Sequence, residues 1–299
     1  MAATDQGAAK VSEPADWRLV KPIYLSDREF KQFSAFIYQI CGIKLPTLKK
    51  TMLSARLNKR LRQLNLSSFE EYFEYVTSPA EQDKELVQMI DAVSTNKTEF
   101  FREAKHFDYL AETVLPEKCK RPQRAGVRTL RVWSAGCSSG EEPYTLAMVL
   151  DDTLKKYPWM DFKVLGTDIC TEVLDKAALG VYSDESVATV PVVFKHKYLM
   201  RGKGGRKGVH RVVPELRHKV SFSRLNFMDR HFGLKEKMDI IFCRNVIIYF
   251  DKKTQIELFQ KFRENLAPAA YLFTGHSESL EGIIENMKKV ESAVYKCPG

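Results

Sequence analysis

The sequence predicts an α/β protein with a mostly parallel sheet, a small helical domain before the sheet and a β-structured insert within it. Three observations predict this arrangement. Residues 21–95 show helical periodicity, residues 96–299 alternate short apolar strands with helices, and residues 181–215 interrupt the alternation. Alternation of this kind favours a parallel sheet covered by helices on both faces. The polar, unpatterned residues 1–20 are expected to form a flexible tail.

Composition sets the class of protein. The chain has 299 residues, of which 44% are hydrophobic and 28% charged, as is typical of soluble globular proteins. No apolar run approaches the roughly 20 residues of a membrane span, and the N-terminus lacks a signal-peptide core, so a cytoplasmic protein is expected. A net charge of +9 suits an acidic protein partner or nucleic acid. Because no RNP-like or zinc-finger pattern is present, nucleic acid is disfavoured.

The cysteines and histidines give no sign of a metal site. Six cysteines are present, without a CxxC pair or a zinc-ligand spacing, and the six histidines show no ligand spacing. We therefore expect reduced thiols, several of them in the core, and no metal. The cysteines are Cys41, Cys119, Cys137, Cys170, Cys243 and Cys297.

Four helices are expected in the helical domain. Ser26 is a plausible N-cap for the first, which Gly42 ends. Leucines recur at helical spacing over residues 53–64, and Ser68 and Ser78 bracket a third helix. The apolar face of the fourth helix consists of Leu86, Met89, Ile90 and Val93.

Residues 94–102 break this periodicity, and a further helix through Phe107 and Val114 is expected to end at Pro116. The strands that follow are predicted at residues 127–133, 162–165, 220–222, 238–243, 270–274 and 290–295, with helices at 173–179 and 254–266. The insert contains an apolar run at 190–194, a basic glycine-rich turn at 202–208 and a strand at 209–213, which together indicate a small β-subdomain.

The turn after the first strand is the main candidate for a ligand site. Gly136 and Gly140 bracket it, and Pro143 suits the first turn of the next helix. It lacks the Gly-Lys-Ser/Thr of a P-loop and the middle glycine of a dinucleotide fingerprint. Glu141 and Glu142 would repel phosphate but suit a cationic ligand such as S-adenosylmethionine. A structural turn with two solvated glutamates is the alternative.

Polar residues also end three later strands. Asp168 follows the second strand, where an acid can accept both hydroxyls of a ribose, and Asn226 and Arg244-Asn245 follow two others. Taken singly, such residues are usually helix caps or turn residues. Because parallel strands end at the same edge of a sheet, their joint placement favours a ligand site.

Five segments resemble the bacterial chemotaxis receptor methyltransferases, the CheR family. They are residues 95–103 (TNKTEFFRE), 132–144 (VWSAGCSSGEEPY), 166–169 (GTDI), 242–250 (FCRNVIIYF) and 275–278 (GHSE). The resemblance implies a helical N-terminal domain, a class I (Rossmann-like) methyltransferase domain and an inserted β-subdomain. It also implies S-adenosylmethionine as methyl donor, S-adenosylhomocysteine as product and receptor glutamates as acceptors.

The resemblance further assigns residues to the donor site. Glu141 or Glu142 would hold the ammonium of the donor, and Asp168 would hold its ribose. Arg102 and Tyr249 would face the transferred methyl group as catalytic residues. The other donor contacts implied are Asn96, Thr98, Arg102, Gly136, Asn226, Phe227, Asn245 and Val246.

For the acceptor, the basic helix at residues 49–62 would offer Arg56, Lys59 and Arg60 to an acidic receptor helix. A solvated basic face is the alternative. The insert would dock a receptor C-terminal peptide by strand addition. A monomer recruited to receptor arrays is expected.

Two other functions are possible from the sequence. One is a non-catalytic module that senses S-adenosylmethionine or its product. The other is a nucleic-acid methyltransferase, but the chain has neither an Asn/Asp-Pro-Pro-Tyr motif nor a convincing catalytic cysteine.

Overall fold

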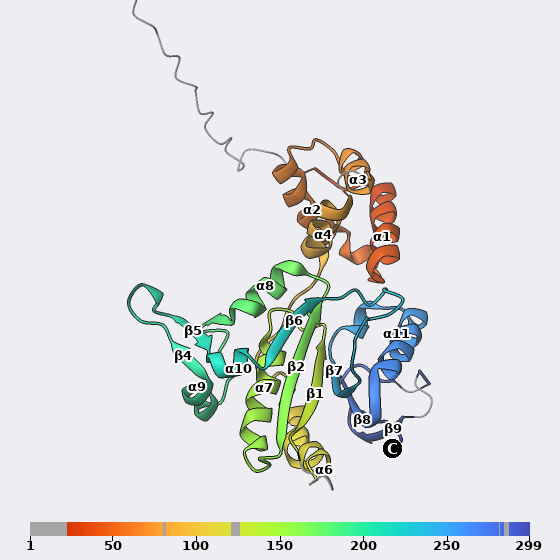
Figure 1. Cartoon of the computed structure of the whole chain (residues 1–299). Helices are drawn as coiled ribbons and strands as arrows, with labels where there is room; N and C mark the ends of the chain where they lie inside the picture. The colour runs from red at the N-terminus through yellow and green to blue at the C-terminus, as the bar shows by residue number, and fades with distance from the viewer. Residues whose placement is uncertain (1–22, 80–81, 121–125, 281, 284–286) are drawn as a thin grey trace, which may run out of the picture.

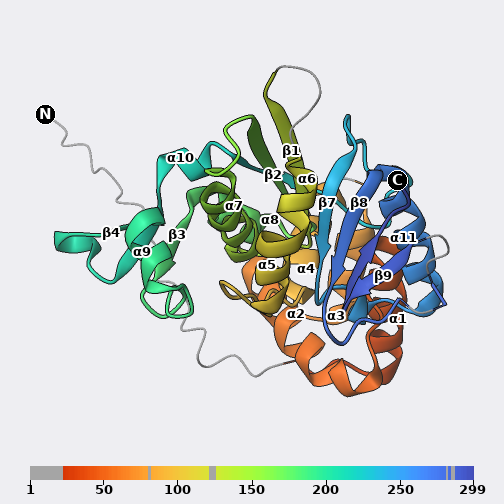
Figure 2. The same cartoon turned by 90° about the horizontal axis from the view of Figure 1, so that it is seen from below.

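The computed structural model describes residues 23–79, 82–120, 126–280, 282–283 and 287–299 (Figure 1). The expected tail at residues 1–20 lies outside these residues. Among the described helices, none combines the length and the apolar character that a membrane crossing requires. The helical domain lies above the carboxyl edge of the sheet in Figure 1, and the insert projects to one side in Figures 1 and 2.

Four helices form the N-terminal domain, as the sequence predicts. They are α1 (Asp27–Cys41), α2 (Lys50–Leu64), α3 (Phe69–Thr77) and α4 (Gln82–Val93), with a short 3-10 turn, η2 (Thr47–Lys49), before α2. Ser26 and Glu29 form a capping box at the start of α1, and Gly42, at φ 72°, ends it. Phe33 packs between Phe69 and Tyr72 in a closed aromatic core.

The helix after residue 104 does not end at Pro116, as predicted, but continues past it. It runs as α5 (Lys105–Tyr109), a π-helical turn η3 (Leu110–Val114) and α6 (Leu115–Lys118). A proline inside a helix lacks an N–H and clashes with the carbonyl four residues before it. The wider π turn lies where that clash would fall, and Pro116 then occupies the first turn of α6, where no N–H is required.

The main sheet has seven strands in the order β6-β2-β1-β7-β8-β10-β9. The first five are parallel, and β10 runs antiparallel to both neighbours. Their bounds are β1 (Arg128–Ala135), β2 (Met160–Asp168), β6 (Val220–Arg224), β7 (Met238–Cys243), β8 (Leu266–Thr274), β9 (Lys288–Glu291) and β10 (Val294–Lys296). The mostly parallel sheet is therefore confirmed, but the single strand predicted at 290–295 is a hairpin, because Ala293 turns the chain at φ 56°.

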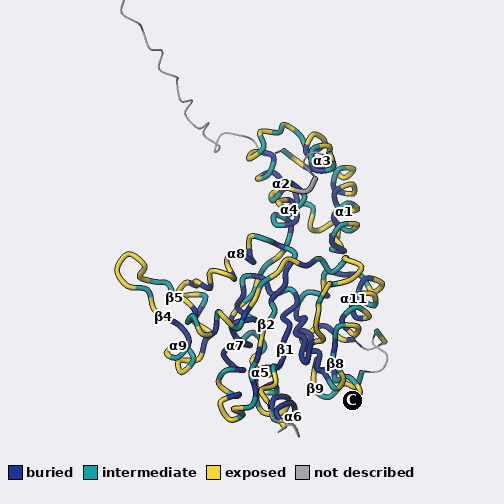
Figure 3. Tube along the Cα trace, in the orientation of Figure 1, coloured by how far each residue is buried: buried dark blue, intermediate teal, exposed yellow. Residues whose placement is uncertain are grey.

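Helices cover both faces of the sheet, as expected. Helix α7 (Glu141–Leu154) packs in one core cluster with α5 and α6, and α11 (Lys252–Asn265) packs in another around Trp133. Every residue of β7 is buried, and the dark central strands of Figure 3 show the same. The short helix α8 (Thr171–Leu179) follows β2.

The helical domain is tied to α8. Asp91 of α4 accepts hydrogen bonds from the backbone N–H of Thr171 (3.0 Å) and of Glu172 (3.1 Å), and from the Thr171 hydroxyl (2.8 Å). These are the free amides of a helix N-terminus, which a capping side chain normally satisfies from the same segment. Here the cap comes from the other domain.

The insert forms a separate antiparallel sheet in the order β3-β5-β4. Its strands are β3 (Val181–Ser183), β4 (Leu199–Arg201) and β5 (Val209–Val212), with a 3-10 turn, η4 (Gly204–Arg206), at the tip between β4 and β5. The apolar run at 190–194 begins helix α9 (Val192–Tyr198) after Pro191, and α10 (Pro214–Arg217) leads back to β6. Phe194 of α9 stacks on Phe101, with ring centroids 5.5 Å apart.

Candidate functional site

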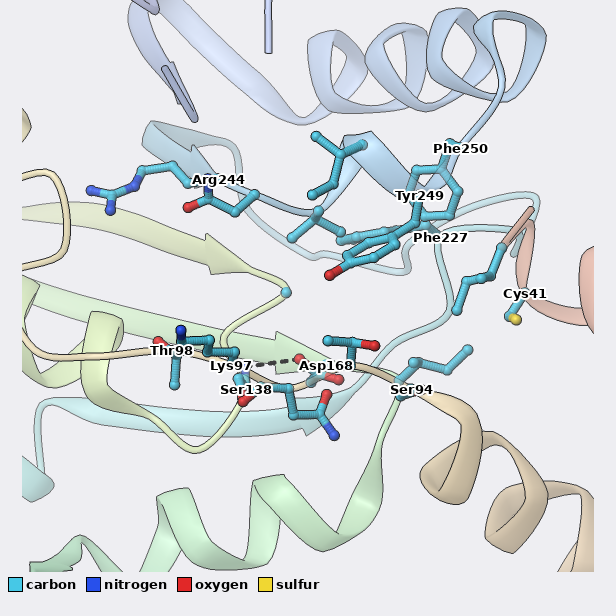
Figure 4. Close-up of a pocket in the computed structure, with 18 of the residues that line it drawn as sticks. Cys41, Ser94, Lys97, Thr98, Ser138, Asp168, Phe227, Arg244, Tyr249 and Phe250 are labelled. Carbon is cyan, nitrogen blue, oxygen red and sulfur yellow. Dashed lines mark hydrogen bonds between the residues drawn. The ribbon is translucent and has the colours of Figure 1, made fainter. Parts of the chain in front are cut away.

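A cavity of about 340 Å³ lies at the carboxyl edge of the sheet, beneath the helical domain (Figure 4). Its walls come from the loop after α1, from residues 93–99 and Arg102, and from the ends of β1, β2, β6 and β7. In Figure 4, Phe227 and Tyr249 lie on one side of the cavity and Ser138 and Asp168 on the other.

The glycine turn forms part of this wall. The backbone N–H groups of Gly136 and Cys137 donate to the carbonyl of Thr167, which joins the ends of β1 and β2. Gly136 adopts φ 83°, and a Cβ built on it would lie 2.5 Å from Cγ2 of Val246. The positive φ and the close contact with Val246 both require glycine at position 136. At this point only the backbone, and no side chain, lines the cavity.

Asp168 ends β2 inside the cavity. Its carboxylate accepts hydrogen bonds from the N–H of Ser138 (2.8 Å) and of Cys170 (3.0 Å). Burial raises the pKa of Asp168, and these hydrogen bonds oppose that rise. The carboxylate is thus fixed between two backbone donors, with lone pairs left for a ligand.

The two glutamates of the turn have different surroundings. Glu142 lines the cavity, accepts a hydrogen bond from the Ser134 hydroxyl (2.7 Å) and lies 3.2 Å from Nε of Arg244. Glu141 is buried, accepts a hydrogen bond from the Ser139 hydroxyl (2.8 Å) and does not line the cavity. The sequence left open which of the two glutamates contacts a ligand. Because Glu142 lines the cavity and Glu141 does not, the structure favours Glu142.

The cavity also brings together the remaining residues that the resemblance implied for the donor, from four separate segments of the chain. Some of their side chains have other partners: Nδ2 of Asn226 donates to the carbonyl of Ile40 (2.7 Å), and that of Asn96 contacts Sγ of Cys170 (3.4 Å). The residues concerned are Asn96, Thr98, Arg102, Gly136, Asn226, Phe227, Asn245, Val246 and Tyr249.

Glu278 supports the site without having been assigned a role from sequence. Its carboxylate accepts from the N–H of Asn245 (2.8 Å) and of Gly275 (2.7 Å), and so fixes the left-handed turn at Asn245, φ 58°. The only sequence signal for a role of Glu278 was its place in the segment 275–278. Its contact with Asn245 spans 33 residues, so local sequence patterns could not show it.

Three carboxylate and imidazole side chains lie close enough to hold a cation. These are Glu103, His106 and His276, beside the cavity. Nε of Arg244, however, lies 3.6 Å from Oε2 of Glu103. A guanidinium already faces that carboxylate, so Glu103 belongs to an ion-pair network with Arg244.

The three basic residues of α2 do not share one free surface. The guanidinium of Arg56 donates to the carbonyls of Val93 and Ser94, and Arg60 forms a two-bond ion pair with Glu85. Lys59 is exposed.

A parallel sheet with a glycine turn after β1, a buried acid at the end of β2 and a carboxylate-lined cavity define a Rossmann-like methyltransferase domain. More specifically, the chain belongs to the CheR methyltransferase family. Residues 96–296 match the CheR methyltransferase, SAM binding domain, and residues 28–94 match the CheR methyltransferase, all-alpha domain.

The curated relatives agree over nearly the whole chain. A chemotaxis protein methyltransferase of Escherichia coli is 41% identical over 278 residues, which are 93% of each chain. Another from Borreliella burgdorferi is 38% identical over 92% of this chain and 95% of its own. Chemotaxis protein methyltransferase 2 of Pseudomonas aeruginosa is 38% identical over 89% and 92%. The chain is therefore a methyltransferase of chemotaxis with a domain that binds S-adenosylmethionine.

If Asp168 holds the ribose of the donor, as the resemblance implies, replacing it with alanine should weaken binding of S-adenosylmethionine and its product by about 1–3 kcal/mol, because the two ribose hydroxyls would lose their acceptor. Titration calorimetry with S-adenosylhomocysteine measures this. Asp161→Ala is the control, since Asp161 lies at the other end of the same strand and pairs with Lys219. Unchanged affinity in a folded Asp168→Ala protein would remove this residue from the donor site.

Proposed function

We propose that the protein transfers methyl groups from S-adenosylmethionine to glutamate side chains on the cytoplasmic helices of chemoreceptors. The observation that carries the proposal is the position of Arg102 and Tyr249, which line the same cavity as Glu142 and Asp168. A donor held by the two acids would thus have an arginine and a phenol beside it. That combination suits a carboxylate acceptor.

The residues present fit the donor. Glu142 would hold its ammonium, Asp168 its ribose, and Phe227 with the Asn226 backbone would flank its adenine. The bound donor supplies an electrophilic methyl group on a positively charged sulfur.

No general base is needed for this reaction. A glutamate acceptor is already ionised at neutral pH, so the protein has only to position it. Arg102 can orient the carboxylate through its fork of N–H donors, and Tyr249 can donate one hydrogen bond. These contacts must leave one carboxylate lone pair free, because that oxygen forms the new bond to carbon. Exclusion of water by the helical domain strengthens both contacts.

The acceptor helix would approach from the helical domain. Lys59 is exposed on α2, and Lys44, Lys49 and Lys97 are exposed at the cavity rim. An acidic helix suits these charges. Arg56 and Arg60, whose guanidiniums are engaged inside the domain, would not contact the receptor directly. They would contribute to docking only by holding α2 in place.

The decisive experiment incubates the protein with donor labelled in the methyl group and with receptor cytoplasmic fragments. Base-labile label on glutamate supports the proposal. Donor binding without label transfer supports a sensing module, and label in nucleic acid would support a nucleic-acid methyltransferase. Neither alternative is favoured by a specific observation in this structure.

We also propose that the insert docks a receptor tail peptide by strand addition, which would bring the enzyme to receptor arrays. Among the described strands, β3 and β4 each pair only with β5, so each has an open edge. Removing the turn at residues 202–208 should abolish binding of tail peptides and spare methylation of receptors without tails. Calorimetry with such peptides tests this, and an intact protein that binds none would contradict it.

A further inference from the structure

Arg244 lines the cavity and contacts residues from two other segments that also line it, Glu142 and Arg102. Its side chain is 2% exposed. Nε lies 3.2 Å from Glu142 and 3.6 Å from Glu103, and Nη2 donates to the backbone carbonyl of Arg102. The guanidinium also lies over the ring of Phe107, 5.2 Å from its centroid. One side chain therefore connects the glutamate proposed to hold the donor with the residue proposed to orient the acceptor.

This placement is not explained by hydrogen bonding alone. Nε and Nη1 of Arg244 are buried, and among the described residues neither has a hydrogen-bond partner of good geometry. Buried polar atoms without partners cost free energy and call for a specific reason. The reason available here is charge, because two carboxylates flank the guanidinium.

Several charged and titratable groups surround Glu142. Burial raises the pKa of Glu142, Arg244 opposes this rise, and Glu103 adds to it. The charge of Arg102 also lowers the pKa of Glu142. Burial holds the pKa of the Cys137 and Cys243 thiols well above their usual range, so both thiols are neutral.

The imidazole behind this group is neutral as well. Burial, followed by the charge of Arg244, lowers the pKa of His106 to about 4. The exposed ring of His276 lies against His106, with ring centroids 4.6 Å apart. Without Arg244, two largely buried carboxylates, 16% and 13% exposed, would lie close together, which favours uptake of a proton by one of them.

Arg244 also acts on the backbone. Phe101 and Glu103 both adopt φ 56°, a conformation that costs free energy for residues other than glycine, and Arg102 lies between them. The hydrogen bond from Nη2 to the Arg102 carbonyl and the ion pair with Glu103 hold this strained segment.

We propose that Arg244 is a positioning residue that keeps Glu142 ionised toward the donor and fixes the backbone that presents Arg102. The inference rests on the proposed donor site at Glu142. It makes one side chain responsible both for donor binding and for orientation of the acceptor.

The test is the pH dependence of S-adenosylhomocysteine binding, measured by calorimetry from pH 4 to 9. Glu142 holds an ammonium only when ionised, so affinity is full above its pKa and is lost as pH falls below it. In Arg244→Met this loss should move to higher pH, and affinity at pH 7 should fall by about tenfold for each unit by which the pKa exceeds 7. In Glu103→Gln, which removes a repelling charge, the loss should move to lower pH.

Three further variants separate this role from a purely structural one. Arg244→Lys keeps the charge, so it should restore the pH profile but not turnover, because its ammonium lacks the fork that reaches Arg102. In a Glu142→Gln background, Arg244→Met should add no pH dependence. Arg128→Met, which leaves the buried Asp239 without its guanidinium at the far end of the sheet, should lower stability without changing the profile.

The outcomes distinguish this inference from the proposed function. Profiles of Arg244→Met and Glu103→Gln parallel to that of the parent would overturn the inference and leave the methyltransferase assignment intact. A parent protein that binds no S-adenosylhomocysteine would overturn the donor site itself. If Arg244→Met does not fold, Arg244→Gln, which removes the charge but keeps a polar side chain, should show the same shift, and a parent-like profile in that variant would overturn the inference.

Discussion

Replacing Arg102 with alanine is expected to reduce turnover by about 10²-fold, the order of loss that a misplaced reacting group causes. Affinity for S-adenosylhomocysteine should change far less. The Arg102 side chain lines the cavity half-buried, and its guanidinium donates within the described residues only to the Lys97 carbonyl, at 3.2 Å. Its remaining N–H groups can therefore orient an acceptor carboxylate, while the donor keeps Glu142 and Asp168.

Single-turnover kinetics with a receptor fragment, together with calorimetry of the product complex, measure the two quantities separately. Tyr249→Phe is the matched comparison, because it removes a single hydrogen bond and should have a smaller effect. Equal losses in turnover and in donor affinity would make Arg102 a binding residue only.

Replacing Arg60 with alanine is expected to lower the free energy of unfolding by about 3–5 kcal/mol, because it leaves a buried carboxylate without its partner. The side chain of Glu85 is 5% exposed and that of Arg60 is 14% exposed. Glu85 also accepts a hydrogen bond from the Tyr72 hydroxyl (2.8 Å), so the unpaired charge would fall within the core of the helical domain.

Urea denaturation tests this expectation, with Lys59→Ala as the control. Lys59 is exposed on the same helix, and its removal should change stability by less than about 0.5 kcal/mol. If both variants are equally stable, the Arg60–Glu85 pair does not support the domain. The comparison also matters for docking studies, since loss of methylation in an Arg60 variant would not by itself report receptor contact.

Much of the fold could be predicted because its signals are local. The capping residue Ser26, the leucine stripe of α2 and the glycine turn after β1 each specify their element within a few residues. Asp168 could be proposed because the carboxyl ends of parallel strands meet at one edge.

The errors arose where distant contacts or backbone detail decide the structure. A π turn that accommodates Pro116 has no simple sequence pattern, and the hairpin at residues 288–296 depends on one left-handed alanine. The partners of Arg60 and Arg244 lie 25 and about 100 or more residues away, so sequence periodicity could not show that both guanidiniums are engaged inside the protein.

The contact of Asp91 with α8 has a consequence for how the molecule behaves as a whole. A helix whose cap belongs to another domain cannot keep its first turn once that domain departs. Thr171 and Glu172 would lose their acceptor, and Cys170, whose N–H holds the Asp168 carboxylate, directly precedes them. We therefore expect the helical domain to stabilise the methyltransferase domain at the point where Asp168 is held. A truncation that begins after α4 should be less stable and should hold the Asp168 carboxylate less firmly.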